Sequence, residues 1–351
     1  MSLLEETLQN IKPVREEARK QIEERWNSIA KPLYSLGKLE KYTTLIGAVL
    51  NDPRISIEKK ALVTFCADNG VVEEGVTQTS QEVTAIVSEN FLKGDTSVCA
   101  MCRKAGVDLF PLDMGMARDT RVRKDFKVAF GTKNMTKEPA MTREEAQKSI
   151  EGGIAIAREL KEKGYQILAV GEMGIGNTTT SSAMASVLLG RDPEEMTGRG
   201  AGLSGEGLIR KKTAIRKAIA LHHPDPSDPL DVLSKVGGFD IGGMMGLYLG
   251  AASLSLPVVL DGFITCTAAL AAIRMCPAVS DYLLCSHVSK EPAAVLILEA
   301  IGKEALIHAD MCLGEGTGAV ALFPLLELAL EVYRSMSTFE DIHVEQYKEL
   351  K

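Results

Sequence analysis

Hydrophobic positions follow two spacings along this chain, and the alternation between them predicts an α/β fold. Short apolar runs typical of buried strands occur at 61–67, 107–112, 166–170, 256–260, 282–285 and 319–323. Between these runs apolar residues recur at helical spacing, most clearly at 143–161 and 207–221. This alternation predicts βαβ units, and therefore an open, mostly parallel (Rossmann-like) sheet flanked by helices.

The two ends of the chain carry helical patterns that are not paired with strands. In the first 30 residues the apolar positions repeat every three or four residues, with a break at Pro13, and residues 325–336 again have a helical pattern. We therefore predict a small helical accessory domain formed by residues 1–60 and 325–351. Residues 61–324 are predicted to form the large α/β domain, which would carry any catalytic site.

Composition narrows the classes of partner. The formal net charge is -7, aromatic residues make up 5% of the chain, and a single tryptophan is present. These values argue against a nucleic-acid or anionic-membrane surface. The seven cysteines are scattered among apolar neighbours, which favours reduced thiols, and the first residues lack the features of a signal peptide. We predict a cytoplasmic protein. Cys99 and Cys102 match C-x-x-C, but no second pair or histidine cluster completes a metal site.

A strand-like run followed by a loop that carries glycine and an acid recurs along the sequence. Such a glycine can simply make a turn and such an acid can cap a helix. The carboxyl ends of parallel strands share one edge of a sheet, however, and four loops of this kind favour a common pocket. The loops are 65–71, 170–177, 258–263 and 312–318.

Two of these loops are chemically the most informative. The segment Gly171–Ser182 lies between a strand-like run and a helical run and combines glycines, one acid and a row of hydroxyl side chains. Free N–H groups at such a junction suit phosphate or ribose. In Gly314–Gly318, glycines flank Glu315, so that a ligand can approach it closely. Desolvation by Leu313 would suit Glu315 to general-base catalysis, whereas the alternative is an ordinary acid in the first turn of a helix.

With these loops in place, the sequence resembles the nicotinate-nucleotide–dimethylbenzimidazole phosphoribosyltransferase (CobT) family of cobamide biosynthesis over nearly its whole length. The matching segments are 31–40, 67–71, 131–134, 139–142, 171–179, 198–202, 237–241, 260–263, 286–292 and 313–318. The resemblance implies transfer of the 5-phosphoribosyl group from nicotinate mononucleotide to 5,6-dimethylbenzimidazole. The products would be α-ribazole 5′-phosphate and nicotinate. It also implies a homodimer that acts on small molecules without a metal or cofactor.

The resemblance assigns roles to particular residues. Glu315 would be the catalytic base and Glu172 a second active-site acid. Lys211 would contact phosphate, although Lys212 is adjacent. The substrate-binding residues that the resemblance implies are Ser80, Gln81, Gly174, Gly176, Asn177, Thr178, Gly200, Gly202, Lys211, Asp261, Gly262, Ser289 and Leu313.

The sequence departs from the family pattern where the family contacts the acceptor base. Asn69 stands where many relatives have histidine, and the loop 74–81 lacks a proline before Gln81. The acceptor is therefore open among a substituted benzimidazole, a purine and another aromatic base. Two other functions stay open at this stage: a catalytically silent nucleotide-binding regulator on the same scaffold, and a metal-dependent phosphate-ester hydrolase or kinase that uses Asp68 and Asp261.

Overall fold

The computed structural model describes residues 1–348 and has a five-stranded sheet at its centre. Every neighbouring pair of strands is parallel, and the order across the sheet is β2-β1-β3-β4-β5. This confirms the predicted α/β class with a parallel sheet. The strands are β1 (Lys60–Ala67), β2 (Val107–Gly115), β3 (Ile167–Met173), β4 (Val258–Leu260) and β5 (Leu283–Cys285).

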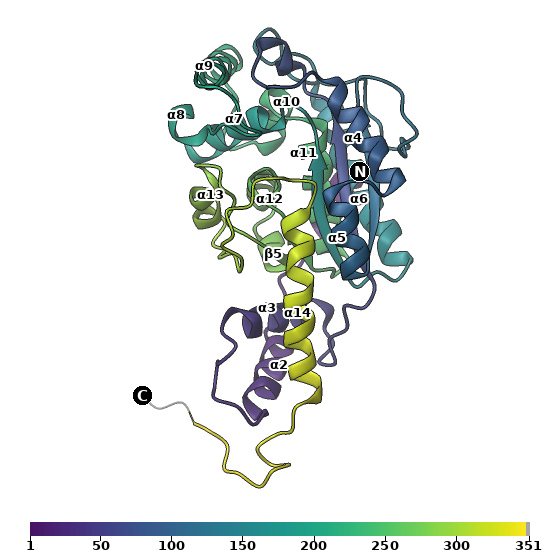
Figure 1. Cartoon of the computed structure of the whole chain (residues 1–351), viewed down its shortest axis with the longest axis vertical. Coiled ribbons are helices and arrows are strands. Elements are labelled where there is room, and N and C mark those ends of the chain that lie inside the picture. Colours follow the sequence, from purple (N-terminus) through teal and green to yellow (C-terminus); the bar gives the residue numbers. More distant parts are fainter. Residues whose placement is uncertain (349–351) are drawn as a thin grey trace.

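Helices connect the strands and cover both faces of the sheet (Figure 1). The helices before β3 are α1 (Leu3–Asn10), α2 (Glu16–Ser28), α3 (Lys38–Leu50), η1 (Gly70–Glu74), α4 (Glu82–Lys93), α5 (Ser97–Ala105) and α6 (Arg143–Glu162). Those after β3 are α7 (Asn177–Leu189), α8 (Pro193–Met196), α9 (Gly205–His222), α10 (Pro229–Val236), α11 (Phe239–Ser253), α12 (Phe263–Met275), η2 (Pro277–Tyr282), α13 (Ala294–Ala300) and α14 (Thr317–Ser335).

One predicted strand is wrong. Residues 319–323 belong to α14, which runs from Thr317 to Ser335. The stretch Ala-Val-Ala-Leu-Phe is apolar at every position, and a short run of this kind fits a fully buried helix as well as a buried strand. Ala319, Val320, Leu322 and Phe323 are all buried, because the start of α14 packs against one face of the sheet.

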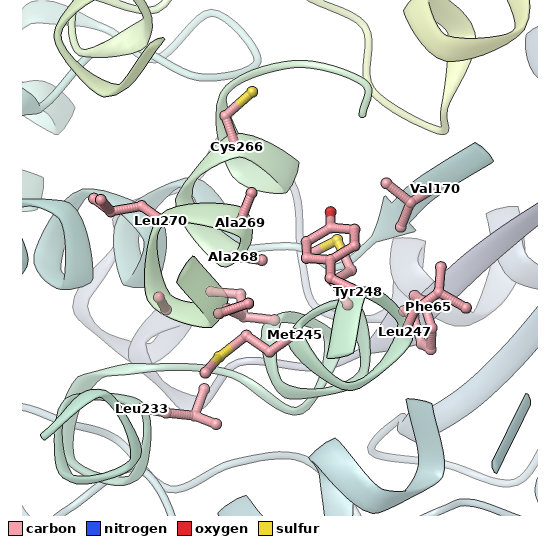
Figure 2. Close-up of a cluster of buried hydrophobic side chains, with 14 of the residues drawn as sticks. Phe65, Val170, Leu233, Met245, Leu247, Tyr248, Cys266, Ala268, Ala269 and Leu270 are labelled. Atoms are coloured by element: carbon pink, nitrogen blue, oxygen red, sulfur yellow. The ribbon is translucent and has the colours of Figure 1, made fainter. Parts of the chain in front are cut away.

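Alternate residues of the strands pack into two separate hydrophobic cores, one on each face of the sheet. On β1, Val63 and Phe65 face the core formed with α6, α7, α10, α11 and α12, whereas Leu62 and Cys66 face the core formed with α3, α4, α5 and α14. This is the period of two expected of a strand covered on both sides. Figure 2 shows part of the first core, where Tyr248 of α11 lies among Phe65, Val170 and side chains of α12.

The lower part of Figure 1 is a group of helices formed by α2, α3 and the second half of α14. Trp26 of α2 and Tyr333 of α14 are buried there, with ring centroids 5.0 Å apart. Helix α1 instead packs against the large part, where Leu4 joins the core that contains α6 and α11. Within residues 1–348, none of the helices combines the length and apolar character needed to span a membrane.

Candidate active site

A cleft lies at the carboxyl ends of β3, β4 and β5. Ligands of open α/β sheets bind at this end of the strands, and β3 is one of the two strands at the point where the strand order reverses. The cleft has a volume of about 270 Å³. It is lined by Val87, Glu172, Met173, Gly174, Ile175, Asn177, Thr178, Gly200, Ala201, Asp261, Gly262, Phe263, Ile264, Thr265, His287, Ser289, Glu291, Cys312, Leu313, Gly314 and Glu315.

Most of the residues singled out from the sequence meet in this cleft. Both proposed acids, Glu172 and Glu315, line it, and so do Gly174, Asn177, Thr178, Gly200, Asp261, Gly262, Ser289 and Leu313. The lining does not include Ser80, Gln81, Gly176, Gly202 or Lys211. The second, third and fourth of the glycine-and-acid loops therefore share one pocket, although the fourth loop follows no strand.

Glu315 sits in an unusual stretch of backbone. Gly314, Glu315 and Gly316 all have positive φ, at 90°, 60° and 94°. Glutamate rarely adopts this left-handed conformation, and residues held in it cluster at functional sites. A Cβ atom on Gly316 would lie 2.6 Å from Cδ1 of Leu62, so the loop passes too close to β1 for a side chain at that position. The flanking glycines thus permit both the path of the loop and its close approach to the sheet.

The carboxylate of Asp261 anchors this loop through hydrogen bonds. This group, at the end of β4, accepts the backbone N–H of Gly316 at 3.1 Å and that of Gly318 at 2.7 Å. These amides lie at the start of α14, where backbone N–H groups have no partners within the helix. Burial raises the pKa of Asp261 to about 7, while the hydrogen bonds from the loop oppose the rise. The structure thus places Asp261 as an anchor for the loop that carries Glu315.

The carboxylate of Glu315 lies at the start of another helix. Its Oε2 accepts the backbone N–H of Val98 at 3.1 Å, in the first turn of α5. The N-terminus of a helix favours negative charge, so this contact stabilises an ionised side chain. Leu313 lines the same cleft and is 58% exposed, so the desolvation of Glu315 by this side chain stays a prediction.

Glu172, by contrast, is enclosed. The residue lies on β3 beside Phe65 of β1, and only 7% of it is exposed. Burial raises the pKa of Glu172 to about 8. The neighbouring carboxylates of Asp240 and Asp261 add to the rise, and the hydrogen bond from Asn177 opposes it. At neutral pH this carboxyl group therefore carries a proton and is a hydrogen-bond donor rather than a base.

A buried cation lies next to the glycine-rich loop 198–202. Lys211 of α9 is 1% exposed, and its Nζ donates to Thr178 Oγ1 at 2.8 Å and to the carbonyl oxygen of Gly198 at 3.2 Å. Burial lowers the pKa of Lys211 to about 8, and the charge of Glu291 opposes this shift. Glu291 also accepts the N–H of Gly200, at 2.9 Å. A buried ammonium group beside the rim of a cleft is suited to an anionic ligand.

The two adjacent lysines have different environments. The Nζ of Lys212 forms an ion pair with Glu194 at the rim of α9, away from the cleft. Lys211 is the one that reaches the loop 198–202, and its contact with phosphate stays a prediction.

The residues that depart from the family pattern lie outside the cleft. Asn69 is fully buried behind the loop 174–177, where its Nδ2 donates to the carbonyl oxygen of Ile175 at 3.5 Å. The side chain of Gln81 lies near Gly131, and that of Gln78 lies near Gly202. Asn69 therefore supports the wall of the pocket and does not line it.

Sequence reasoning missed three residues that contribute to the site. Asp240, in the first turn of α11, accepts a hydrogen bond from Asn177 at 3.1 Å. His287 lines the cleft with its Nδ1 3.7 Å from Asp261 Oδ1, and burial lowers the pKa of this histidine to about 4, so that it is neutral. Glu291 contacts Gly200. The available signal was that all three lie in segments of the family pattern, 237–241 and 286–292.

Comparison with known proteins first defines the class of protein. The sequence pattern of a phosphoribosyltransferase family matches residues 11–344 of this chain. The nicotinate-nucleotide–dimethylbenzimidazole phosphoribosyltransferase of Acetivibrio thermocellus is 46% identical over 348 residues, which cover 99% of each chain. The enzyme of the same name from Ruminiclostridium cellulolyticum is 46% identical over 349 residues, again 99% of each chain.

Solved structures agree with these relatives. The crystal structure of CobT from Thermus thermophilus superimposes with a TM-score of 0.88 at 38% identity, covering 94% of this chain and 100% of that one. The chain therefore belongs to the nicotinate-nucleotide–dimethylbenzimidazole phosphoribosyltransferase family.

Proposed function

We propose that this protein transfers the 5-phosphoribosyl group of nicotinate mononucleotide to 5,6-dimethylbenzimidazole or a related aromatic base, in the assembly of the nucleotide loop of cobamides. One observation carries the proposal: a single cleft holds two carboxyl groups in different surroundings, Glu315, which accepts a backbone N–H at the start of α5, and Glu172, whose pKa burial raises to about 8. The buried cation Lys211 lies beside the same cleft, next to Thr178 and Gly200.

The chemistry needs one proton acceptor. A ring nitrogen of the base forms a bond to C1′ of the ribose as the bond from C1′ to the nicotinate nitrogen breaks, and the departing electron pair neutralises the pyridinium. The attacking base then carries one proton too many, on its other nitrogen. Glu315 takes that proton, since the first turn of α5 stabilises its ionised form. The remaining catalysis is positioning of the two substrates.

The donor phosphate is proposed to bind at Lys211. The hydrogen-bond partners of the ammonium group, Thr178 and Gly198, are neutral, and Glu291 is the acid whose charge acts on it, without a direct ion pair, so the ammonium group is open to an anionic ligand. Replacing Lys211 with methionine keeps most of the volume and removes the charge. We expect the KM for nicotinate mononucleotide to rise by roughly ten- to a hundredfold, the equivalent of one charge-assisted hydrogen bond.

The matched control is Lys212→Met on the next residue of α9, whose ion pair with Glu194 lies at the surface. Steady-state kinetics of both variants measures the effect. Equal KM values for the two variants would remove Lys211 from the phosphate site.

The activity itself is tested directly. The protein is incubated with nicotinate mononucleotide and, in separate and mixed reactions, dimethylbenzimidazole, unsubstituted benzimidazole and adenine, and the products are identified by mass. We expect a ribotide of at least one base together with free nicotinate. No product with any of these bases would leave a silent nucleotide-binding protein as the better proposal. The mixed reaction ranks the acceptor bases. Asn69 lies behind the pocket and does not line it, so its side chain does not indicate which base is preferred.

The same proposal includes a homodimer in the cytoplasm. Exposed apolar side chains occur on α14 and on the segment that follows it, with Leu328 at 66%, Ile342 at 50% and Val344 at 47% exposure. A second copy of the chain that covers them would form the interface of the proposed dimer. All seven cysteines are free, which suits a reducing compartment. Light scattering coupled to size exclusion should give twice the mass of one chain, and a monomer would reject the dimer.

A further inference from the structure

The side-chain amide of Asn177 joins two buried carboxyl groups. Its Nδ2 donates to Oε2 of Glu172 and to Oδ2 of Asp240, the latter at 3.1 Å. An amide nitrogen carries two N–H groups, so it makes both bonds at the same time. The three side chains come from β3, from the first residue of α7 and from the first turn of α11. Asp240 is fully buried and, unlike Glu172, does not line the cleft.

The two acids differ in how well the protein stabilises a negative charge on them. Oδ1 of Asp240 accepts the backbone N–H of Ile241 at 3.0 Å, at the start of α11, where helical amides favour an anion. Glu172 is at the end of a strand, and Asn177 is the donor found for it within residues 1–348. Two carboxyl groups that share one donor resist ionising together. The geometry therefore puts the charge on Asp240 and the proton on Glu172.

We propose that Asp240 is a positioning residue for Glu172. It orients the shared amide of Asn177, which fixes the direction of the Glu172 carboxyl group, and its own negative charge keeps that group protonated. The inference rests on the proposed transferase function for its consequence. With Oε2 occupied by Asn177, the proton resides on Oε1, which lies beside Gly314 at the wall of the cleft. Of Glu172 and Glu315, only Glu315 is then ionised, so the proton released by the acceptor base goes to Glu315.

The electrostatic surroundings of the pair act in the same direction. Burial raises the pKa of Glu172 to about 8 and that of Asp240 to about 6. The charge of Asp240 adds to the rise for Glu172, and the charge of Asp68 adds to the rise for Asp240. The other titratable groups that face the pair are Cys66 on β1, Asp68 after β1, Asp261 after β4 and Glu315 before α14.

The first test is Asp240→Asn, which keeps the shape of the side chain and removes its charge. The proton of Glu172 is followed by NMR in protein labelled with ¹³C at the glutamate carboxyl carbon, and Glu172→Gln identifies the resonance. Removal of a negative neighbour lowers the pKa of an acid, so we expect Glu172 to titrate about one pH unit lower. The alkaline limit of kcat/KM should move with it, while the KM for nicotinate mononucleotide changes less than about threefold.

The second test is Asn177→Leu, which removes the amide and leaves both acids in place. Asn177 donates to the ionised form of Glu172, so its loss should move the titration of Glu172 upward, opposite to the effect of Asp240→Asn. A merely structural disturbance would not produce shifts of opposite sign. Shifts of the same sign, or no shift in either variant, would overturn the proposal.

The third test is the double variant Glu172→Gln, Asp240→Asn. If Asp240 acts through Glu172, its substitution adds less than about a twofold change in kcat once Glu172 no longer titrates; a full, independent loss contradicts the inference. Asp113→Asn is the matched control, because Asp113 is also fully buried but pairs with Lys127 on the far side of β1. It should leave the Glu172 titration unchanged. The NMR titration needs no turnover, so it decides the role of Asp240 even if the protein fails to make a ribotide.

Discussion

Two of the segments that bring carboxyl groups into the cleft, those of Glu172 and Glu315, are built in opposite ways. Glu172 continues a regular strand, is almost enclosed, and shares its hydrogen-bond donor with a second buried acid. Glu315 lies in a left-handed backbone between two glycines, is partly open to solvent, and accepts an amide at the start of a helix. The first environment favours a proton and the second a charge. Two identical carboxyl groups can thus be suited to the proposed roles of acid and base by their surroundings alone.

The largest effect is expected of Glu315→Gln, which tests the proposed base role of Glu315. Glutamine cannot take the acceptor's proton, so we expect kcat to fall by roughly 10²–10⁴. The affinity for nicotinate mononucleotide, measured by calorimetry, should stay within about threefold, because the glutamine side chain keeps its size. A variant with full turnover would transfer the base role to another group.

The left-handed loop itself is tested by Gly316→Ala. The new Cβ would meet Leu62 at 2.6 Å in a backbone with φ of 94°. We expect a loss of roughly 2–4 kcal/mol in the free energy of unfolding, the sum of a positive-φ penalty and overpacking.

Gly302→Ala is the control, with φ of 66° and nothing within 4 Å of the added atom. It should cost about 1 kcal/mol in a urea titration. Equal losses in the two variants would show that the contact with β1 is unimportant.

Glu172→Gln should have a smaller effect on kcat/KM, and it tests whether Glu172 is protonated during turnover. Glutamine imitates the protonated form, so kcat/KM below about pH 7 should change by less than about tenfold. In the wild type, activity should decline as pH rises through about 8, where Glu172 ionises, and the variant should lack this decline. A pH profile of both proteins measures it. A loss as large as that of Glu315→Gln would mean that both carboxyl groups exchange protons during turnover.

The smallest expected effect is on stability. The pKa of Glu172 is raised in the folded protein, from 4.5 to about 8, so its contribution is fully present below pH 4.5 and is lost as pH rises towards 8. Asp240 and Asp261 act in the same direction. Glu172→Gln should therefore reduce, without abolishing, the fall in Tm between about pH 5 and pH 8. The surface variant Glu345→Gln is the control and should keep the wild-type slope; an unchanged slope in Glu172→Gln would place the proton elsewhere.

Much of the fold was predictable because local patterns were strong. The alternation of apolar runs and helical spacing indicated the parallel sheet, and five of six predicted strands match β1 to β5 within a few residues. The sixth became the start of α14, because an unbroken apolar run has no period that separates a buried helix from a buried strand.

The sequence could predict only those parts of the site that lie within a single loop. The glycines around Glu315 indicated an acid with room for a ligand beside it, and the structure places it in the cleft. Asp240 could not be found in this way, since its link to Glu172 passes through Asn177 and depends on three elements far apart in sequence. Likewise, adjacent lysines on a helix point about 100° apart, and only the packing of α9 shows that Lys211 faces inward.

Helix α14 connects the cleft with the group of helices formed by α2 and α3. It begins directly after Gly316, where Asp261 holds its first turn, and continues for 19 residues into the group formed with α2 and α3 (Figure 1). At about 1.5 Å per residue this is a rod about 28 Å long. A truncation that discards the terminal helices would cut that rod and shorten the helix that begins beside Glu315. We therefore expect a fragment without them to lose the geometry of the cleft as well.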